Sequence, residues 1–150
     1  MYSIMIVEDE ELVRQGLTSL VNYEQFGMKV IDQAENGRIA WEKFQAQSAD
    51  LLLTDINMPQ LNGLDLAQLV REKAPSCHII FLTGYDDFEF AQKAIRLGAD
   101  DYLLKPFSKA DIEEMLEKVK NKLDEEGKKA QVETLVDQGH STELEKAIHS

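Results

Sequence analysis

Residues 51–59 read LLLTDINMP, an apolar run that ends in Asp55 and is closed by Pro59. The run has the length and the apolar content of a strand that is buried on both faces. Asp55 is therefore expected at the tip of a buried strand. In α/β proteins ligands bind just beyond the carboxyl ends of the strands, so this carboxylate occupies a position where chemistry is common.

Three other strand-like runs also end in residues that carry ionisable or hydroxyl groups. If the strands are parallel neighbours, these side chains converge with Asp55 on one edge of the sheet, although they lie far apart in the sequence. The residues that follow the three runs are Glu8 and Asp9, Thr83, and Lys105.

Short apolar runs alternate with amphipathic segments along the first 124 residues. This alternation is typical of an α/β fold in which helices cover both faces of a parallel sheet. We expect strands near 3–7, 29–34, 51–54, 78–83 and 101–104, and helices near 10–21, 37–47, 63–73, 87–97 and 109–123. Capping side chains at Asn62, Asp86 and Ser108 each stand three residues before an acid, which indicates three of the helix starts.

Composition sets further limits on fold and function. The chain has 150 residues with 43% hydrophobic content, which suits one domain with a sizeable core. Its net charge of -12 argues against direct contact with nucleic acid, because phosphate binding needs clustered Lys and Arg. The lone Cys77 cannot form an internal disulfide. Neither a membrane span of roughly 18 apolar residues nor a signal peptide is evident, so we expect no membrane contact and a cytoplasmic location.

The composition changes at residues 124–129, which are polar and include the helix breaker Gly127. We therefore expect a compact domain at residues 1–124. Residues 125–150 carry too few apolar side chains for a core of their own and are expected to form a linker or a helical extension, with a second break at Gly139.

The convergent residues favour phosphoryl chemistry. Three carboxylates at one edge repel one another by about 3–4 kcal/mol per pair, if charges 4–5 Å apart feel a dielectric constant of about 20. A divalent cation and a lysine would balance this charge, and oxygen ligands with open water positions favour Mg2+. A phosphoryl acceptor site needs a nucleophile, a metal, a cation and a hydroxyl donor. Asp55, a metal at Asp9, Lys105 and Thr83 could fill these four roles.

These residues stand in motifs that resemble the receiver domain of a two-component response regulator over about residues 2–123. Each motif alone is weak, but their order and spacing together are highly specific. The motifs are the acidic pair Glu8-Asp9, the pattern Asp55-Ile56-Asn57-Met58-Pro59 with Gly63, Thr83-Gly84, Gly98-Ala99-Asp100-Asp101-Tyr102, and Lys105-Pro106-Phe107.

The resemblance implies a flavodoxin-like fold, a doubly wound sheet of five parallel strands in the order 2-1-3-4-5. It also implies that a sensor histidine kinase transfers a phosphoryl group to Asp55, where Thr83 and Lys105 stabilise it. The bond between Lys105 and Pro106 would be cis and would aim the ammonium inward. Such a domain is not an enzyme in the usual sense, because it catalyses only the gain and loss of its own phosphoryl group.

The resemblance further implies a set of metal ligands for Mg2+. Asp9, Asp55 and the backbone carbonyl of Asn57 would hold the ion. Glu8 replaces the aspartate that commonly stands first in the acidic pair, and we expect its longer side chain to reach the metal through water.

Residues 82–91, LTGYDDFEFA, resemble receivers that precede AraC-type DNA-binding domains. This resemblance implies a piece of a longer transcription regulator, with residues 125–150 leading toward a covalent output domain that is absent from this chain. The segment itself would contact no nucleic acid.

The function that we expect is a phosphorylation-controlled switch. Phosphorylation would pull Thr83 toward Asp55, vacate space for Tyr102, and change a surface made by helix 87–97, strand 101–104 and helix 109–123. An alternative interpretation of Tyr102 is a half-buried strand aromatic, which is compatible with the switch role. The readout would be a partner or a second copy, which would form a homodimer on phosphorylation.

Three other functions can be weighed against the switch. A phosphorylation-independent interaction domain with a receiver-like fold is the main alternative, and the retained acceptor, metal and lysine positions speak against it. A flavodoxin-like cofactor binder would need a phosphate-cradling loop after the first strand, where Glu8, Asp9 and Glu10 would repel phosphate. A phosphatase of the haloacid dehalogenase type would need an aspartate at the position of Asn57.

Overall fold

The computed structural model describes residues 1–84, 88–96 and 98–138. The cap expected at Asp86 and the helix break expected at Gly139 lie outside these residues. The chain divides into two compact units, Met1–Glu114 and Met115–Ser150, and the first contains the whole sheet.

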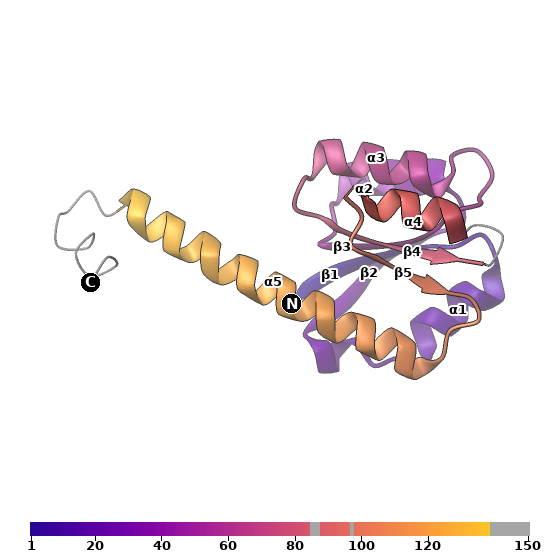
Figure 1. Ribbon diagram of the computed structural model, residues 1–150, viewed down its shortest axis with the longest axis horizontal. Helices are drawn as coiled ribbons and strands as arrows, with labels where there is room; N and C mark the ends of the chain where they lie inside the picture. The colour runs from indigo at the N-terminus through magenta and orange to yellow at the C-terminus, as the bar shows by residue number, and fades with distance from the viewer. Residues whose placement is uncertain (85–87, 97, 139–150) are drawn as a thin grey trace. The chain divides into compact units, whose positions relative to one another are not determined.

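The five strands form one parallel sheet in the order β2-β1-β3-β4-β5, which confirms the expected fold (Figure 1). Along the chain, β1, β2 and β3 precede the loop at residues 56–62 that follows Asp55, and β4 and β5 come after it. The bounds are β1 Tyr2–Val7, β2 Met28–Ala34, β3 Leu51–Asp55, β4 His78–Thr83 and β5 Asp101–Leu104.

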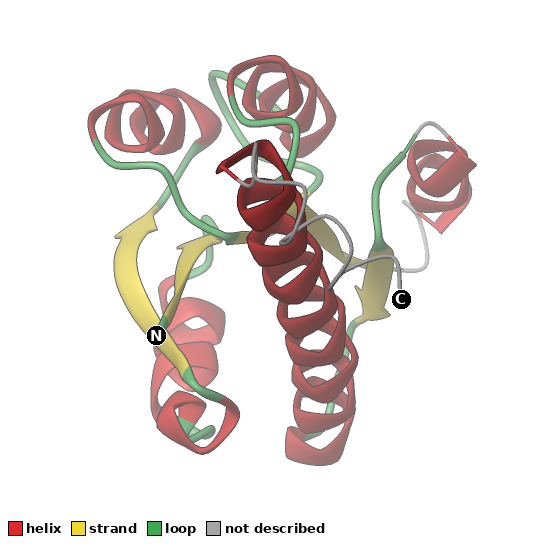
Figure 2. Ribbon diagram, turned by 90° about the vertical axis from the view of Figure 1, so that its left-hand side faces the viewer, coloured by secondary structure: helices red, strands yellow, loops and turns green. Residues whose placement is uncertain are grey.

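Helices lie on both sides of this sheet. In Figure 1, α2, α3 and α4 lie on one face and α1 lies on the other, and the turned view in Figure 2 shows the strands as a layer between helices. A short 3-10 helix, η1, was not expected from the sequence. The bounds are α1 Glu11–Ser19, η1 Tyr23–Phe26, α2 Gly37–Ala46, α3 Gly63–Lys73, α4 Phe88–Arg96 and α5 Lys109–Gln138.

The core on the α2, α3 and α4 side is built from alternate strand residues, because successive side chains of a strand point to opposite faces. Each fully buried apolar side chain contributes about 1.5–3 kcal/mol relative to exposure, so this layer holds the strand ends firmly in place. Its members include Met5, Val7, Leu52, Ile79 and Phe81 from the sheet, with Phe44, Leu66, Val70 and Ala91 from the helices.

Side-chain caps fix where the helices begin. The Asn62 side chain accepts a hydrogen bond of 2.9 Å from the amide of Asp65 at the start of α3. Ser108 and Asp111 form a reciprocal capping box, with bonds of 2.9 and 3.1 Å. Two of the expected caps are thus confirmed, and both place helix starts directly after the loops that leave the carboxyl edge of the sheet.

Helix α5 is longer than the sequence indicated. It runs for 30 residues and passes Gly127 without a break, so the expected helix end near residue 123 is wrong. Glycine costs about 1 kcal/mol relative to alanine inside a helix, and the Glu and Lys residues on either side of Gly127 are good helix formers. Among the described residues, every helix is too short or too polar to span a bilayer.

Candidate functional site

Asp55 is the last residue of β3 and is buried. Its Oδ1 accepts a hydrogen bond of 2.8 Å from the backbone amide of Ile56, and the Thr54 hydroxyl donates to its carbonyl oxygen at 2.9 Å. These two bonds fix the orientation of the carboxylate at the strand end. Oδ2 is the oxygen that faces the neighbouring cation.

That cation is Lys105, which directly follows β5. Its Nζ lies 2.7 Å from Glu8 Oε1, 3.4 Å from Asp55 Oδ2 and 4.0 Å from Glu10 Oε1. The peptide bond between Lys105 and Pro106 is cis. Lys105 therefore contacts carboxylates from distant parts of the sequence at one edge of the sheet.

The three carboxylates that were expected to converge do so. Glu8, Asp9 and Asp55 each offer one ligand oxygen, and these oxygens all lie within 4.8 Å of one another. Glu8 is completely buried, and its Oε2 has no hydrogen-bond partner among the described residues. Such an oxygen is costly unless a cation or a proton occupies the adjacent space.

The pKa values of the cluster reflect mainly its burial. Burial raises the pKa of Glu8 to about 8, with a further rise from the nearby Asp55 and an opposing effect of Lys105. Burial also raises the pKa of Asp55, although Lys105 opposes the shift. Partial burial would lower the pKa of Lys105, but its hydrogen bond to Glu8 and the charge of Asp55 raise it overall. The single positive charge of Lys105 does not balance the negative charge of three ionised carboxylates, and a bound metal cation would.

Thr83 lies on β4, the strand next to that of Asp55, and Tyr102 lies on β5, one strand further out. Thr83 is the buried last residue of β4, and its hydroxyl donates to the carbonyl of Gly84 at 3.1 Å. Tyr102 is half-buried in β5, and its ring meets the edge of Phe88 from α4 at a centroid distance of 5.4 Å and an angle of 83°. The ring contact joins the strand of Tyr102 to the start of α4.

The loop at residues 56–62 leads from Asp55 to α3 and carries Asn57, which is exposed. The amide of Gly63 donates to the carbonyl of Ile56 at 2.8 Å, which closes the loop. A Cβ at Gly63 would lie 1.9 Å from the Asp55 carbonyl oxygen, so only glycine fits there. Gly63 belongs to the motif that resembles receivers, and this close approach is the physical reason for a glycine there.

Sequence reasoning missed one contact that holds the acidic pair. Arg14 of α1 donates through Nη1 to the carbonyl of Glu8 at 2.6 Å. This bond fixes the turn after β1 from which Glu8 and Asp9 project. Neither spacing nor periodicity signals it, because it depends on how α1 lies over the strand end.

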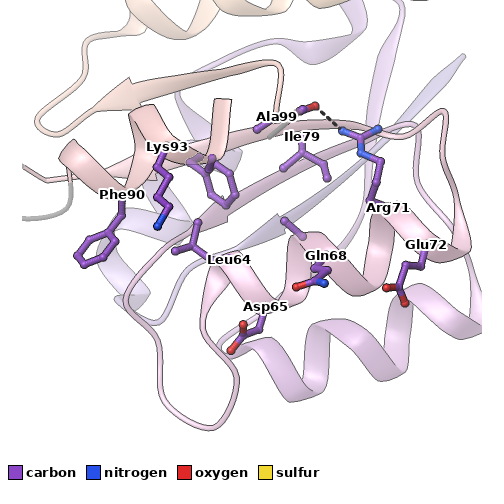
Figure 3. A pocket seen from close by; sticks show the side chains of 13 residues that line it. Leu64, Asp65, Gln68, Arg71, Glu72, Ile79, Phe90, Lys93 and Ala99 are labelled. Atoms are coloured by element: carbon purple, nitrogen blue, oxygen red, sulfur yellow. Dashed lines mark hydrogen bonds between the residues drawn. The ribbon is translucent and has the colours of Figure 1, made fainter. Parts of the chain in front are cut away.

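A hollow of about 560 Å3 lies elsewhere, between α3, β4 and α4. Figure 3 shows Leu64 and Ile79 facing it, whereas the carboxylates of Asp65 and Glu72 extend away. Arg71 at one end donates to the carbonyl of Gly98 at 3.1 Å. None of the expected site residues lines this hollow, so the candidate site is the carboxyl edge of the sheet.

Comparisons with known proteins agree with this geometry. The model of the response regulator receiver domain family matches residues 4–117. The chain is 44% identical over 119 residues to the sensory transduction protein LytR of Staphylococcus haemolyticus, covering 79% of this chain and 45% of that protein. The chain spans between 32% and 54% of the length of the first curated relatives that it matches.

Two solved structures extend the comparison to the fold. The receiver domain of AraT, a response regulator from Geobacillus stearothermophilus, superposes with a TM-score of 0.81 at 42% identity, covering 84% of this chain and 98% of that one. The two-component transcriptional regulator AraC from Clostridium phytofermentans gives a TM-score of 0.74 at 34% identity, covering 79% and 92%. The expected resemblance is therefore confirmed.

Receiver domains are regulatory phosphoacceptor domains rather than classical enzymes, they interact with sensor histidine kinases, and they use Mg2+ at an acidic pocket. The described part of this chain has such a pocket in Glu8, Asp9 and Asp55. The chain belongs to the response regulator receiver domains of two-component systems, which act as phosphorylation-dependent switches.

Proposed function

We propose that Asp55 is the phosphoacceptor of this receiver domain. The observation that carries the proposal is the position of its carboxylate, with Oδ1 held by the Ile56 amide and Oδ2 3.4 Å from Lys105 Nζ. A nucleophilic carboxylate must be ionised, and the nearby ammonium favours the ionised form. Of the three clustered carboxylates, Asp55 is the one whose two oxygens are engaged separately, one by a backbone amide and one by the neighbouring cation.

The residues at this edge fit a magnesium ion. The unpartnered, buried Oε2 of Glu8 and the spacing of the three carboxylates within 4.8 Å are what a hard divalent cation with oxygen ligands would satisfy. We propose that Asp9, Asp55 and the backbone carbonyl of Asn57 hold Mg2+, with Glu8 bound through water. When bound, Mg2+ neutralises charge on the phosphoryl oxygens.

The proposed reaction uses the side chains of this chain in distinct roles. An Asp55 oxygen attacks the phosphorus of the donor, an oxygen–phosphorus bond forms, and the bond to the leaving group breaks. Lys105 donates to a phosphoryl oxygen and stabilises its charge. Water later cleaves the acyl phosphate, so the domain catalyses only the gain and the loss of its own phosphoryl group.

The switch step involves Thr83 and Tyr102. We propose that the Thr83 hydroxyl exchanges its bond to the Gly84 carbonyl for one to the phosphoryl group on Asp55, and that Tyr102 then changes its packing against Phe88. Amide chemical shifts test this step. Phosphorylated Thr83→Ala should lack the perturbations around Tyr102 and Phe88 that phosphorylated wild type shows, and identical perturbations would refute the role.

The receiver would act on a partner beyond this chain. A relative by structure is described as a two-component transcriptional regulator, and the chain covers only part of its curated relatives. We propose that a sensor histidine kinase is the donor, that a DNA-binding output domain follows residue 150, and that phosphorylation favours a homodimer. Sedimentation of the phosphorylated chain with its output domain would test the dimer, and an unchanged monomer would contradict it.

The intact mass after incubation with Mg2+ and acetyl phosphate tests the acceptor. Wild type should gain about 80 Da, the mass of one phosphoryl group. Asp55→Asn and the wild type in excess chelator should gain none. Equal labelling of Asp55→Asn would refute the assignment, and an unlabelled wild type would favour the phosphorylation-independent interaction domain.

A further inference from the structure

The N-terminus of α2 lies against the loop that follows Asp55, although it contributes no side chain to the acidic cluster. Gly37 is the buried first residue of α2. A Cβ on Gly37 would lie 2.0 Å from the carbonyl oxygen of Leu61 and 2.8 Å from its carbonyl carbon. Figure 1 shows α2 and α3 side by side on the same face of the sheet, with this loop leading into α3.

The glycine is required by space and not by backbone conformation. Of the described glycines, only Gly27 and Gly98 have a positive φ. At Gly37 the obstacle is a backbone oxygen, which cannot rotate away as a side chain would. An added methyl group would have to displace the loop or the helix by more than 1 Å to reach an ordinary contact distance.

The helix cannot easily yield, because its start is fixed. Asn36 is buried and caps α2 by accepting a hydrogen bond of 2.8 Å from the Ile39 amide. Phe44, also on α2, is completely buried in the core. The strain of an added methyl group would therefore be relieved mainly by the loop.

The loop shows a second contact with the same helix end. Arg38 Nε donates to the Gln60 side chain at 2.7 Å, and Gln60 has the left-handed φ of 71°. Such a conformation is uncommon for a residue other than glycine and persists where surrounding contacts hold it. The ends of the loop between Asp55 and Gly63 are held close together by the approach of Gly63 to the Asp55 carbonyl, and its carboxyl-terminal half is held by Gly37 and Arg38 against Leu61 and Gln60.

We infer that Gly37 is a positioning residue for the phosphorylation site, acting with Arg38 through the loop at residues 56–62. The close contact with Leu61 sets where the loop passes, and the loop carries the Asn57 carbonyl. The inference rests on the proposed function, because it concerns the carbonyl assigned there to Mg2+. A misplacement of about 1 Å at such a site can cost up to about a hundredfold in rate.

The test compares Gly37→Ala with Gly16→Ala in the full chain. Gly16 lies inside α1, and a Cβ there would make an ordinary contact of 3.8 Å with Leu20. Titration calorimetry of MgCl2 gives the Mg2+ affinity, intact mass gives the rate of labelling by acetyl phosphate, and thermal unfolding in chelator gives stability. Gly37→Ala should bind Mg2+ at least about tenfold more weakly and label more slowly, with Gly16→Ala like wild type.

Comparing the Mg2+ affinity of Gly37→Ala with its unfolding temperature separates a positioning role from simple destabilisation. A purely structural role would lower the unfolding temperature of Gly37→Ala and leave its Mg2+ affinity unchanged, and that result would overturn the inference. If wild type and Gly16→Ala also fail to label, the proposed function itself has failed. If they label and Gly37→Ala labels equally well, only the positioning role is wrong.

Arg38→Ala provides a second variant should Gly37→Ala not fold. It removes the hydrogen bond to Gln60, together with the exposed ion pair of Arg38 with Glu42 on the same helix, without adding any atom. Loss of one such bond corresponds to about a threefold weaker Mg2+ affinity, if the loop position depends on it. An unchanged affinity in Arg38→Ala would overturn the role of the α2 N-terminus in that case.

Discussion

The two ends of the sheet hold acidic side chains in opposite circumstances. At the amino end, Asp100 accepts a hydrogen bond of 2.7 Å from the Ile79 amide, lies 2.8 Å from His78 Nδ1, and has Arg71 at 3.8 Å. At the carboxyl end, the carboxylates of Glu8, Asp9 and Asp55 cluster, Lys105 pairs with two of them, and an oxygen of Glu8 has no partner among the described residues.

The difference separates a structural network from a functional site. Donors at the amino end satisfy the acid, so the cluster there stabilises the fold. The carboxyl end retains uncompensated negative charge, which lowers the stability of the domain until a cation binds. Residues that destabilise a fold are typical of sites where a ligand supplies the missing partner.

The pH dependence of stability should expose this contrast most strongly. The pKa of Glu8 is about 8 in the folded protein against 4.5 when unperturbed. Between these values the folded state retains a proton that the unfolded state releases, so the free energy of unfolding falls as the pH rises. In chelator we expect a fall on the order of 3–4 kcal/mol between about pH 5 and 8, measured by denaturant unfolding.

Two variants sharpen the pH experiment. Glu8→Gln should remove most of the slope and make the metal-free protein more stable at pH 8. Asp100→Asn, at the other end of the sheet, should keep the slope. An equally steep slope in Glu8→Gln would show that the buried carboxylate is not the cause.

Magnesium should relieve the same repulsion. A ligand that binds only the folded state stabilises it by about 2.7 kcal/mol at a concentration of 100 times Kd. Thermal unfolding at pH 7.5 should therefore show a higher Tm with MgCl2 than in chelator. Asp9→Ala should abolish this shift in Tm, because Asp9 is one of the proposed Mg2+ ligands in the carboxylate cluster. A normal shift in Asp9→Ala would place the ion elsewhere.

The amino end should respond to loss of charge in the opposite direction from Glu8. Asp100→Asn puts an amide where the Ile79 amide and His78 need an acceptor, and should lower the free energy of unfolding by about 2 kcal/mol. Glu125→Gln, at an exposed position, serves as the control and should change stability by less than about 0.5 kcal/mol. An Asp100→Asn protein as stable as the control would mean that the network contributes little.

The contrast between the ends also explains what the sequence could predict. Asp55 ends an apolar strand, and Glu8 and Lys105 each directly follow one, so parallel topology alone brings them together. The network around Asp100 could not be predicted. Arg71 contacts Asp100 from the last turn of α3, and no sequence pattern indicates which side chains of a helix contact a distant strand. The contact of Gly37 with Leu61 was missed for the same reason, since it depends on the path of a loop.

Helix α5 shows a different limit of sequence reasoning. Gly127 was interpreted as a break, yet the energetic cost of one glycine is too small to end a helix among strong helix formers. The boundary at residue 124 stays a prediction. The sequence predicts this boundary where the apolar pattern stops. Burial follows the same pattern, since Leu123 is the last buried residue whose side chain is described.

Removing the chain beyond Glu126 should have the smallest effect. The residues Glu125 to Lys128 are exposed, so a chain ending at Glu126 retains every buried side chain that is described. We expect the free energy of unfolding to change by less than about 0.5 kcal/mol, as for other changes at exposed positions. Phosphorylation of Asp55 should be unchanged, because the carboxyl edge of the sheet lies within the first compact unit.

Denaturant unfolding measures the stability of the full and the shortened chain, and intact mass measures their phosphorylation. A loss of several kcal/mol would show that residues 127–150 stabilise the receiver, and their interpretation as a linker or helical extension would then be wrong.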